Sequence, residues 1–180
     1  MSFANIPLGD KAPELVNVVI EIPKGSHNKY EYDEDFDEIK LDRVLHSALF
    51  YPADYGFIPQ TRSEDGDHLD ILVIITDPVF PGCVLRVRPI GVLNMKDEAG
   101  QDWKIIGVAE NDPRQSDERT LDDIDEHYKK EISNFFEEYK KLENKQVKVK
   151  NWLGKRDAYK LINEAHRRFN KEKDSEDGDR

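Results

Sequence analysis

Cysteine is almost absent from this chain, and long uncharged runs are absent altogether. Cys83 is the single cysteine among 180 residues, which excludes an internal disulfide and any cysteine-rich zinc site. No uncharged stretch approaches the roughly 20 residues of a membrane-spanning helix. Asp10, Lys11 and Glu14 interrupt the segment in which a signal peptide would carry its apolar block. We therefore expect a protein of the reducing cytoplasm that is neither exported by that route nor inserted into a membrane.

Positive charge is scarce relative to negative charge. The chain has 27 Lys and Arg against 38 Asp and Glu, a net charge of -11, which repels a nucleic-acid backbone. The motifs G-x-x-x-x-G-K-[ST], G-x-G-x-x-G, H-E-x-x-H and G-x-S-x-G are also missing. Their absence removes the nucleotide-phosphate loop, the dinucleotide fold, the helix-borne zinc site and the serine nucleophile elbow. We expect no nucleic-acid partner and no covalent nucleophile.

The first two thirds of the chain are rich in short apolar runs separated by turn residues. Each run is four to eight residues long and contains many Val, Ile and aromatic residues, which predicts strands. The runs cover residues 15–22, 29–32, 69–76, 84–88, 92–97 and 103–108. Because the connections between them are short and contain no helix, the pattern favours an antiparallel barrel over a parallel sheet.

The hydrophobic period changes after residue 117. Apolar residues from Leu121 to Leu142 recur every three or four positions, which predicts one long amphipathic helix. A short alternating strand at 147–149 and a second, shorter helix at 158–169 follow. Residues 171–180 contain no apolar side chain and are predicted to be a disordered acidic tail, so residues 1–170 are expected to form a single domain.

The strongest local motif is the run D-G-D-H-L-D from Asp65 to Asp70, with Asp67 between them. Three carboxylates this close repel one another unless water solvates them or a hard divalent cation neutralises them. The run therefore indicates either a metal site or an ordinary solvated acidic turn. It is not a calcium EF-hand loop, because the fifth and sixth positions of such a loop do not fit Leu69 and Asp70.

A second acidic pair, Asp97 and Asp102, brackets four turn residues. If those four residues form a hairpin loop, the two carboxylates lie about 5 Å apart across it and could share a cation. Lys104 follows Asp102 by two positions and so points to the same face of an extended strand. The alternative is an exposed hairpin with a surface salt bridge, which contributes little to stability.

Four charged residues upstream could complete a polar cavity. Lys29 and Glu31 share one strand face by parity, and Glu21 ends an apolar run where a charge would face a cavity rather than a core. Arg43 follows an alternating apolar segment. Taken singly, each of these side chains is more often solvated on a surface than functional.

Three tyrosines and a lysine have equally open interpretations. Tyr51 and Tyr55 belong to a proline- and aromatic-rich segment at 50–59, where their hydroxyls could contact a polar ligand or be satisfied in the core. Tyr139 fits the apolar stripe of the long helix, and the adjacent Lys140 lies off it. Together, the acids and the basic groups are the combination that metal-assisted phosphoryl transfer to water requires.

These residues lie in segments that resemble family I soluble inorganic pyrophosphatases. The resemblance extends from about Glu14 to about Glu143 and preserves the order of several independent motifs. The segments are VVIEIP (18–23), KYE (29–31), DR (42–43), FYPADYGFIPQT (50–61), DGDHLD (65–70), RPIGVLNMKDEAGQDWK (88–104) and FFEEYKKLE (135–143). This chain has His68 where the family pattern usually has Pro or Glu.

The resemblance implies a mainly β fold, an OB-like five-stranded antiparallel barrel flanked by a long and a shorter C-terminal helix. It implies hydrolysis of pyrophosphate to two phosphates with several Mg2+ ions and no covalent intermediate, in a cytoplasmic homohexamer. Asp67 would be the general base. The metal ligands would be Asp65, Asp70, Asp97 and Asp102. The substrate-binding residues would be Lys29, Arg43, Tyr55, Tyr139 and Lys140. The supporting residues would be Glu21, Glu31, Tyr51 and Lys104.

Two other functions compete with this one. A metal-dependent hydrolase of nucleotides or other phosphoesters would use the same chemistry in a larger pocket, although the sequence lacks a nucleotide motif. A non-catalytic OB-like binding module would carry the acids only as surface groups. The position of the Asp65, Asp70 and Asp102 side chains separates the cavity from the surface interpretation.

Overall fold

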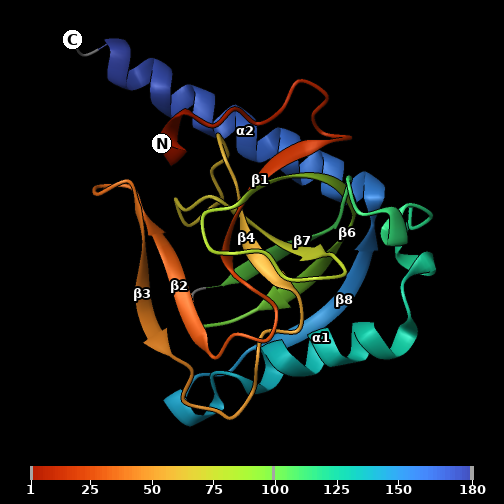
Figure 1. Cartoon of the computed structure of the whole chain (residues 1–180). Helices are drawn as coiled ribbons and strands as arrows, with labels where there is room; N and C mark the ends of the chain where they lie inside the picture. Colours follow the sequence, from red (N-terminus) through yellow and green to blue (C-terminus); the bar gives the residue numbers. More distant parts are fainter. Residues whose placement is uncertain (1, 99, 179–180) are drawn as a thin grey trace.

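A computed structural model describes residues 2–98 and 100–178, without the side chains of 176–178. These residues form mostly strands, with four short 3-10 turns and two α-helices (Figure 1). The strands are β1 (Val16–Ile22), β2 (Asn28–Asp33), β3 (Glu38–Val44), β4 (Asp54–Ile58), β5 (Leu69–Ile74), β6 (Val84–Lys96), β7 (Gln101–Ala109) and β8 (Lys148–Gly154). The helices are α1 (Glu126–Glu138) and α2 (Lys155–Gly178). The 3-10 turns are Phe3–Asn5, Pro113–Gln115, Leu121–Asp123 and Lys141–Glu143.

Five strands close into a ring. The hydrogen-bonded order is β1-β4-β5-β7-β6, and β6 pairs back with β1, while β8 extends the sheet beyond β6. This closed ring with two helices near the end of the chain confirms the predicted fold class. One detail differs from the prediction, because β5 and β7 pair in parallel whereas the other pairs in the ring are antiparallel. Among the described strands, each strand of the ring is therefore paired on both edges.

The strands differ from the predicted runs in several places, and two of them, β3 and β4, lie outside those runs. The segment at 50–59 contains β4, which sequence reasoning left unassigned because prolines flank it. The two runs predicted at 84–88 and 92–97 belong to the single strand β6, whose register shifts between Pro89 and Gly91. A strand can bend at such an irregularity without ending.

Gly56 is the point at which β4 lies closest to β1. A methyl group built on Gly56 would lie 1.9 Å from the carbonyl oxygen of Val19. Only glycine permits this approach, and the pairing of Ile20 with Gly56 depends on it. The ring therefore relies on a residue that carries no hydrophobic signal in the sequence.

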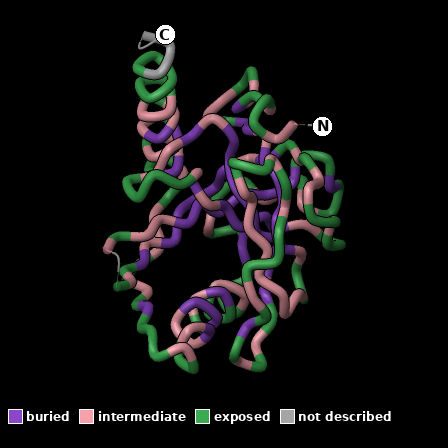
Figure 2. Tube along the Cα trace, turned by 90° about the vertical axis from the view of Figure 1, so that its left-hand side faces the viewer, coloured by how far each residue is buried: buried purple, intermediate pink, exposed green. Residues whose placement is uncertain are grey.

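The ring strands carry buried side chains on both faces, and buried residues are purple in Figure 2. In β5, Leu72 and Ile74 belong to the cluster that packs against α1, while Ile71 and Val73 belong to the cluster that packs against α2. Complete burial of each such side chain contributes about 1.5–3 kcal/mol. This double burial explains why the ring strands have continuous apolar runs rather than strict alternation.

The relative lengths of the two helices were predicted wrongly. The first, α1, spans 13 residues, because Asp125 caps its N-terminus by accepting hydrogen bonds from the backbone N–H groups of His127 and Tyr128. The second, α2, spans 24 residues and continues through Gly178. The predicted disordered tail is therefore helical over 171–178, and its last two residues lie outside the described part. Within the described residues, no helix is both long and apolar enough to span a membrane.

Strands β2 and β3 form a two-stranded sheet of their own. This β2–β3 hairpin stands beside the ring in Figure 1, and its residues are partly or fully exposed. No strand of the described chain pairs with it by backbone hydrogen bonds. It forms one wall of the cavity that the ring, the hairpin and α2 enclose.

Candidate active site

A cavity of about 930 Å³ lies between one end of the ring, the β2–β3 hairpin and α2. All the residues predicted for the site line this cavity except Arg43 and Tyr51. The predicted residues that line it are Glu21, Lys29, Glu31, Tyr55, Asp65, Asp67, Asp70, Asp97, Asp102, Lys104, Tyr139 and Lys140. Six separate segments of the chain therefore contribute charged or phenolic groups to one space.

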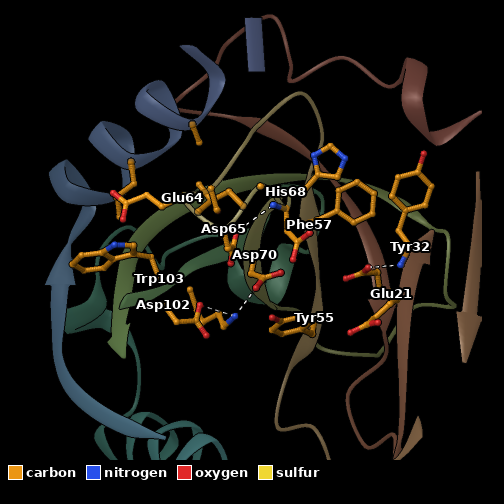
Figure 3. A pocket seen from close by; sticks show the side chains of 18 of the residues that line it. Glu21, Tyr32, Tyr55, Phe57, Glu64, Asp65, His68, Asp70, Asp102 and Trp103 are labelled. Carbon is orange, nitrogen blue, oxygen red and sulfur yellow. Dashed lines mark hydrogen bonds and ion pairs between the residues drawn. The ribbon is translucent and has the colours of Figure 1, made fainter. Parts of the chain in front are cut away.

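Asp70 and Asp102 meet at the ammonium group of Lys104. Asp70 lies on β5 and the other two on β7; the Lys104 Nζ donates to Asp70 and lies 2.8 Å from Asp102 Oδ1. Figure 3 shows Asp65, Asp70 and Asp102 extending into the same space. The surface interpretation of these acids is therefore wrong for Asp70 and Asp102, which are both partly buried.

Burial and opposite charge act against each other in this group. Burial alone would lower the pKa of Lys104, but Asp70 and Asp102 hold that pKa well above its ordinary value. Burial raises the pKa of Asp102, against the lowering effect of Lys104. The carboxylates are thus partly neutralised by a fixed ammonium group, and they retain oxygen atoms directed at the cavity.

The acidic loop at 63–67 forms the open rim of the cavity. Asp65 accepts a hydrogen bond from the backbone N–H of Asp67 at 3.1 Å, and the N–H of Ser63 donates to the Asp67 carbonyl at 2.8 Å. These bonds hold the loop as a tight turn that presents both carboxylates to solvent at the rim. Burial raises the pKa of Asp67, and the charges of Asp65 and Asp70 raise it further.

The opposite wall carries the basic groups of the hairpin. Lys29 on β2 donates to Glu31 and lies 3.2 Å from Asp42 Oδ2. Arg43 on β3 contacts the same Asp42, and its Nε donates to Glu143 Oε1 at 3.1 Å. Arg43 therefore points along the hairpin toward the segment after α1 and is not among the lining residues, and its predicted role in holding the substrate stays a prediction.

Glu21 is buried at the end of β1, beneath the hairpin. Its Oε1 accepts a hydrogen bond from the backbone N–H of Tyr32 at 2.7 Å (Figure 3). Burial, with a contribution from the charge of Asp70, raises the pKa of Glu21 to about 8. A carboxyl group with such a pKa is largely protonated at neutral pH and becomes a ligand or an acceptor once a cation approaches.

The hairpin between β6 and β7 places Asp97 differently from the prediction. Lys96 pairs with Gln101 and Met95 with Asp102, so Asp97 lies in the turn rather than opposite Asp102. The Asp97 carboxylate lies 3.6 Å from the Nζ of Lys140. Burial lowers the pKa of Lys140, against the raising effect of Asp97. Asp97 and Asp102 nevertheless line the same cavity, as predicted, and Lys140 lines it too.

The tyrosines separate into a lining pair and a supporting residue. Tyr55 and Tyr139 line the cavity, and burial raises the pKa of both hydroxyls above the ordinary value. Tyr51 lies behind them with 3% of its surface exposed and contacts Tyr55 edge to face at a centroid distance of 5.6 Å. We therefore assign Tyr51 to packing that fixes Tyr55.

The oxygen donors suit a hard divalent cation, although they do not form a complete cage. Among the described residues, no group of three or more His, Cys, Asp or Glu side chains is arranged to hold an ion. Mg2+ does not need one, because it usually retains several waters and is bound through one or two carboxylates together with substrate phosphates. The carboxylates of Asp65, Asp70, Asp97 and Asp102, all facing one cavity, fit this mode.

Sequence reasoning missed several residues of the cavity walls. Glu34 at the tip of the hairpin and His68 directly after the acidic loop line the cavity, and Lys160 reaches it from α2. Asp42 connects Lys29 with Arg43. Parity along β2 and β3 could have suggested Asp42, but nothing local in the sequence indicated that the tip of the hairpin meets the acidic loop.

A closed five-stranded ring with a carboxylate- and lysine-lined cavity at one end defines an OB-like β protein with a polar site. Comparison with known proteins places it more closely. The family model described as "Inorganic pyrophosphatase" matches residues 18–170. The chain belongs to the inorganic pyrophosphatase family.

Individual relatives agree with this assignment. The inorganic pyrophosphatase of Thermus thermophilus is 51% identical over 171 residues, which cover 93% of this chain and 98% of the relative. That of Methanosarcina acetivorans is 49% identical over 156 residues, which cover 87% and 93% of the two chains. The crystal structure of inorganic pyrophosphatase from Thermus thermophilus superposes with a TM-score of 0.92 and 49% identity, over 94% of this chain and 99% of that one.

Proposed function

We propose that this chain hydrolyses inorganic pyrophosphate to two orthophosphates, with Mg2+ as cofactor and without a covalent intermediate. The observation that carries the proposal is the convergence of Asp70, Asp102 and Lys104 with the acidic loop in one cavity. The printed names of the relatives support the choice of substrate. When bound, Mg2+ would neutralise charge on pyrophosphate and lower the pKa of a water molecule.

Asp67 is the proposed general base. It lies on the rim of the cavity, where an attacking water has access from solvent, and it follows the proposed metal ligand Asp65 by two residues. Burial and the neighbouring acids raise its pKa, so its carboxylate is a stronger base than that of a free aspartate. It accepts the proton of the water as the oxygen attacks phosphorus.

The basic and phenolic side chains are proposed to hold the substrate. Lys29 of the hairpin and Lys140 of the segment after α1 line the cavity, and so do Tyr55 and Tyr139. Arg43, anchored by Asp42 and Glu143, adds positive charge at the hairpin wall. These cations stabilise the negative charge that grows on the leaving phosphate.

The proposed metal ligands are Asp65, Asp70, Asp97 and Asp102. Lys104 keeps two of them apart and oriented before a cation binds. Glu21 and Glu31 are proposed to support the cavity by hydrogen bonds and charge balance, and Tyr51 by fixing Tyr55. A homohexamer in the cytoplasm completes the proposal, and it derives from the family resemblance.

The experiment is a phosphate-release assay with pyrophosphate and, separately, with ATP. We expect release from pyrophosphate only when Mg2+ is present, and complete but reversible loss of activity with excess EDTA. Equal or faster release from ATP would favour the nucleotide hydrolase. Full activity in metal-stripped protein would reject the metal-assisted mechanism, and no release from either compound would favour a binding module.

A further inference from the structure

The β2–β3 hairpin carries substrate-binding groups but is not part of the ring. In the described residues it shares no backbone ladder with the six-stranded sheet. Its base is continuous with β1 and with the segment before β4, where the N–H of Leu45 donates to the His27 carbonyl at 2.9 Å. Within the described part of the chain, the contacts that position its tip are made through side chains, including that of Asp37, which accepts a hydrogen bond from the N–H of Phe3 at 2.8 Å.

Glu34 connects the tip of the hairpin with the segment that precedes the acidic loop. The Arg62 guanidinium donates to both oxygens of Glu34, at 2.7 Å from Nη1 and 2.9 Å from Nη2. A two-pronged pair of this kind fixes the relative orientation of its partners as well as their separation. Arg62 has 15% of its side chain exposed, so it is held in the wall rather than free in solvent.

Arg62 is itself fixed by α2. Its Nε donates to Glu172 at 2.8 Å, its guanidinium lies 5.5 Å from the centroid of the Phe169 ring, and its backbone N–H donates to Ala165. The guanidinium group is thus held by α2 through one nitrogen and donates hydrogen bonds to Glu34 through the other two. This contact gives the last turns of α2 a part in building the cavity.

His68, directly after the acidic loop, also contacts Glu34. Its Nε2 lies 2.9 Å from Glu34 Oε1, and its ring stacks on Phe57 at a centroid distance of 4.8 Å and an angle of 13°. Tyr32 of the hairpin packs against both of these rings, with its centroid 5.0 Å from that of Phe57 and 6.1 Å from that of His68 (Figure 3). Because His68 lies between the proposed base Asp67 and ligand Asp70, its place determines where the loop stands relative to the hairpin.

We propose that Glu34, Arg62 and His68, the Glu34 latch, set the width of the cavity by joining the hairpin wall to the acidic-loop wall. The latch consists of positioning residues, which act on the substrate through Lys29 and Glu31 on one wall and through the acidic loop on the other. The inference rests on the proposed function. Displacement of binding groups by about 1 Å can cost a large part of a catalytic rate or of an affinity.

A plain surface salt bridge would have a different signature. Exposed ion pairs contribute about 0–1 kcal/mol to stability, and a pair that did not position the cavity walls would leave the affinity for substrate unchanged. Glu34 has 49% of its side chain exposed, so the stability contribution of the latch is small. The latch hypothesis therefore predicts a change in KM without a comparable change in thermal stability.

The first test is the steady-state kinetics of Glu34→Ala and Arg62→Ala at saturating Mg2+. We expect each variant to raise KM for pyrophosphate about fivefold, with kcat within twofold of the parent chain. The double variant should raise KM no further, because both substitutions break one connection. Glu110→Ala is the matched control, since it breaks an ion pair of similar exposure, that of Glu110 with Arg88, which does not line the cavity, and it should leave KM unchanged.

The second test needs neither substrate nor metal. In the metal-free protein, hydrogen exchange at the tip of the hairpin should be at least tenfold faster in Glu34→Ala than in the parent chain, and unchanged in β5 and β7. An unchanged KM together with unchanged exchange would overturn the latch, and so would an equal rise in KM in Glu110→Ala. A parent chain that does not hydrolyse pyrophosphate would overturn the proposed function alone, because the exchange result still tests the latch.

Discussion

At the scale of single residues, the cavity buries several carboxyl groups, and burial makes their ionisation costly. The raised pKa of such a group can be measured through the pH dependence of folding stability. Glu21 is buried and has a pKa of about 8, and burial also raises the pKa values of Asp67 and Asp102. Lys104 offsets part of this cost for Asp102. A bound cation would stabilise the ionised form of these carboxyl groups, which is why we expect a cation in the cavity.

Glu21→Gln should change how stability depends on pH in the metal-free protein. The Glu21 carboxyl stays protonated in the folded chain up to about pH 8, whereas it ionises near 4.5 when unfolded. Its contribution to folding stability is therefore full below pH 4.5 and is lost as the pH rises toward 8. Urea unfolding should show the variant gaining a few kcal/mol over the parent chain between pH 5 and pH 8, since each pKa unit corresponds to about 1.4 kcal/mol.

Glu126→Gln serves as a control in which the stability difference from the parent chain should change with pH in the opposite direction. Lys129 holds the pKa of Glu126 below its ordinary value, so this carboxylate stabilises the fold at neutral pH and ceases to do so in acid. The variant should lose stability relative to the parent chain as the pH rises. A constant stability difference between Glu21→Gln and the parent chain across the whole range would contradict the buried state of Glu21.

Asp67→Asn tests the proposed base. The substitution preserves size and removes the ability to accept a proton, so kcat should fall at least about 100-fold. Glu64→Gln, three positions earlier on the same exposed loop, should remain within twofold. Phosphate release by Asp67→Asn at the rate of the parent chain would exclude Asp67 as the base.

At the scale of elements, the closure of the ring depends on how β4 approaches β1. A methyl group at Gly56 would collide with the Val19 carbonyl at 1.9 Å, and backbone atoms there cannot move without breaking the β1–β4 ladder. Gly56→Ala should therefore lower the free energy of unfolding by about 3 kcal/mol or more, as overpacked and strained positions do.

Gly154→Ala is the matched comparison for Gly56→Ala. Gly154 ends β8, and an added methyl group there would meet no atom within 4 Å. Its free energy of unfolding should change by less than about 0.5 kcal/mol. Equal effects of the two substitutions, measured by denaturant unfolding, would show that the close contact of β4 with β1 does not limit stability.

At the scale of the whole molecule, several large apolar side chains remain on the surface of the single chain. They are Phe36, Leu41, Val44, Phe50, Phe80, Val84 and Leu142. Apolar side chains on a monomer surface are compatible with contacts between subunits, although scattered ones need no explanation. The family resemblance predicts the number of subunits, and these residues are candidates for the contacts.

The predicted hexamer has a direct test. Light scattering on the eluted protein should give a mass about six times that of one chain and independent of concentration over the micromolar range. A mass equal to one chain at every concentration would contradict the homohexamer. Because the cavity is formed within one chain, activity per chain in such a monomer would still be expected.

Much of the site was predictable because its residues belong to short motifs. The acidic run at 65–70, the pair of Asp97 with Asp102, and Lys104 two positions later were all identified from spacing, and the resemblance supplied their proposed roles. The strand runs were visible because β-branched and aromatic residues cluster in them. The places of Arg43, Tyr51 and Asp97 were not predictable, because they depend on register and on side-chain direction rather than on spacing.

The composition and pattern of the sequence by themselves determined a β-rich chain with helices near its end, an acidic surface and a set of carboxylates with lysines. Only the tertiary structure decided that β5 and β7 pair in parallel, that α2 is the longer helix, and that Glu34 meets Arg62 and His68. Patterns along a chain record which face of an element is apolar. They do not record which distant segment covers that face, since this is decided by closure of the ring and by packing among residues far apart in sequence.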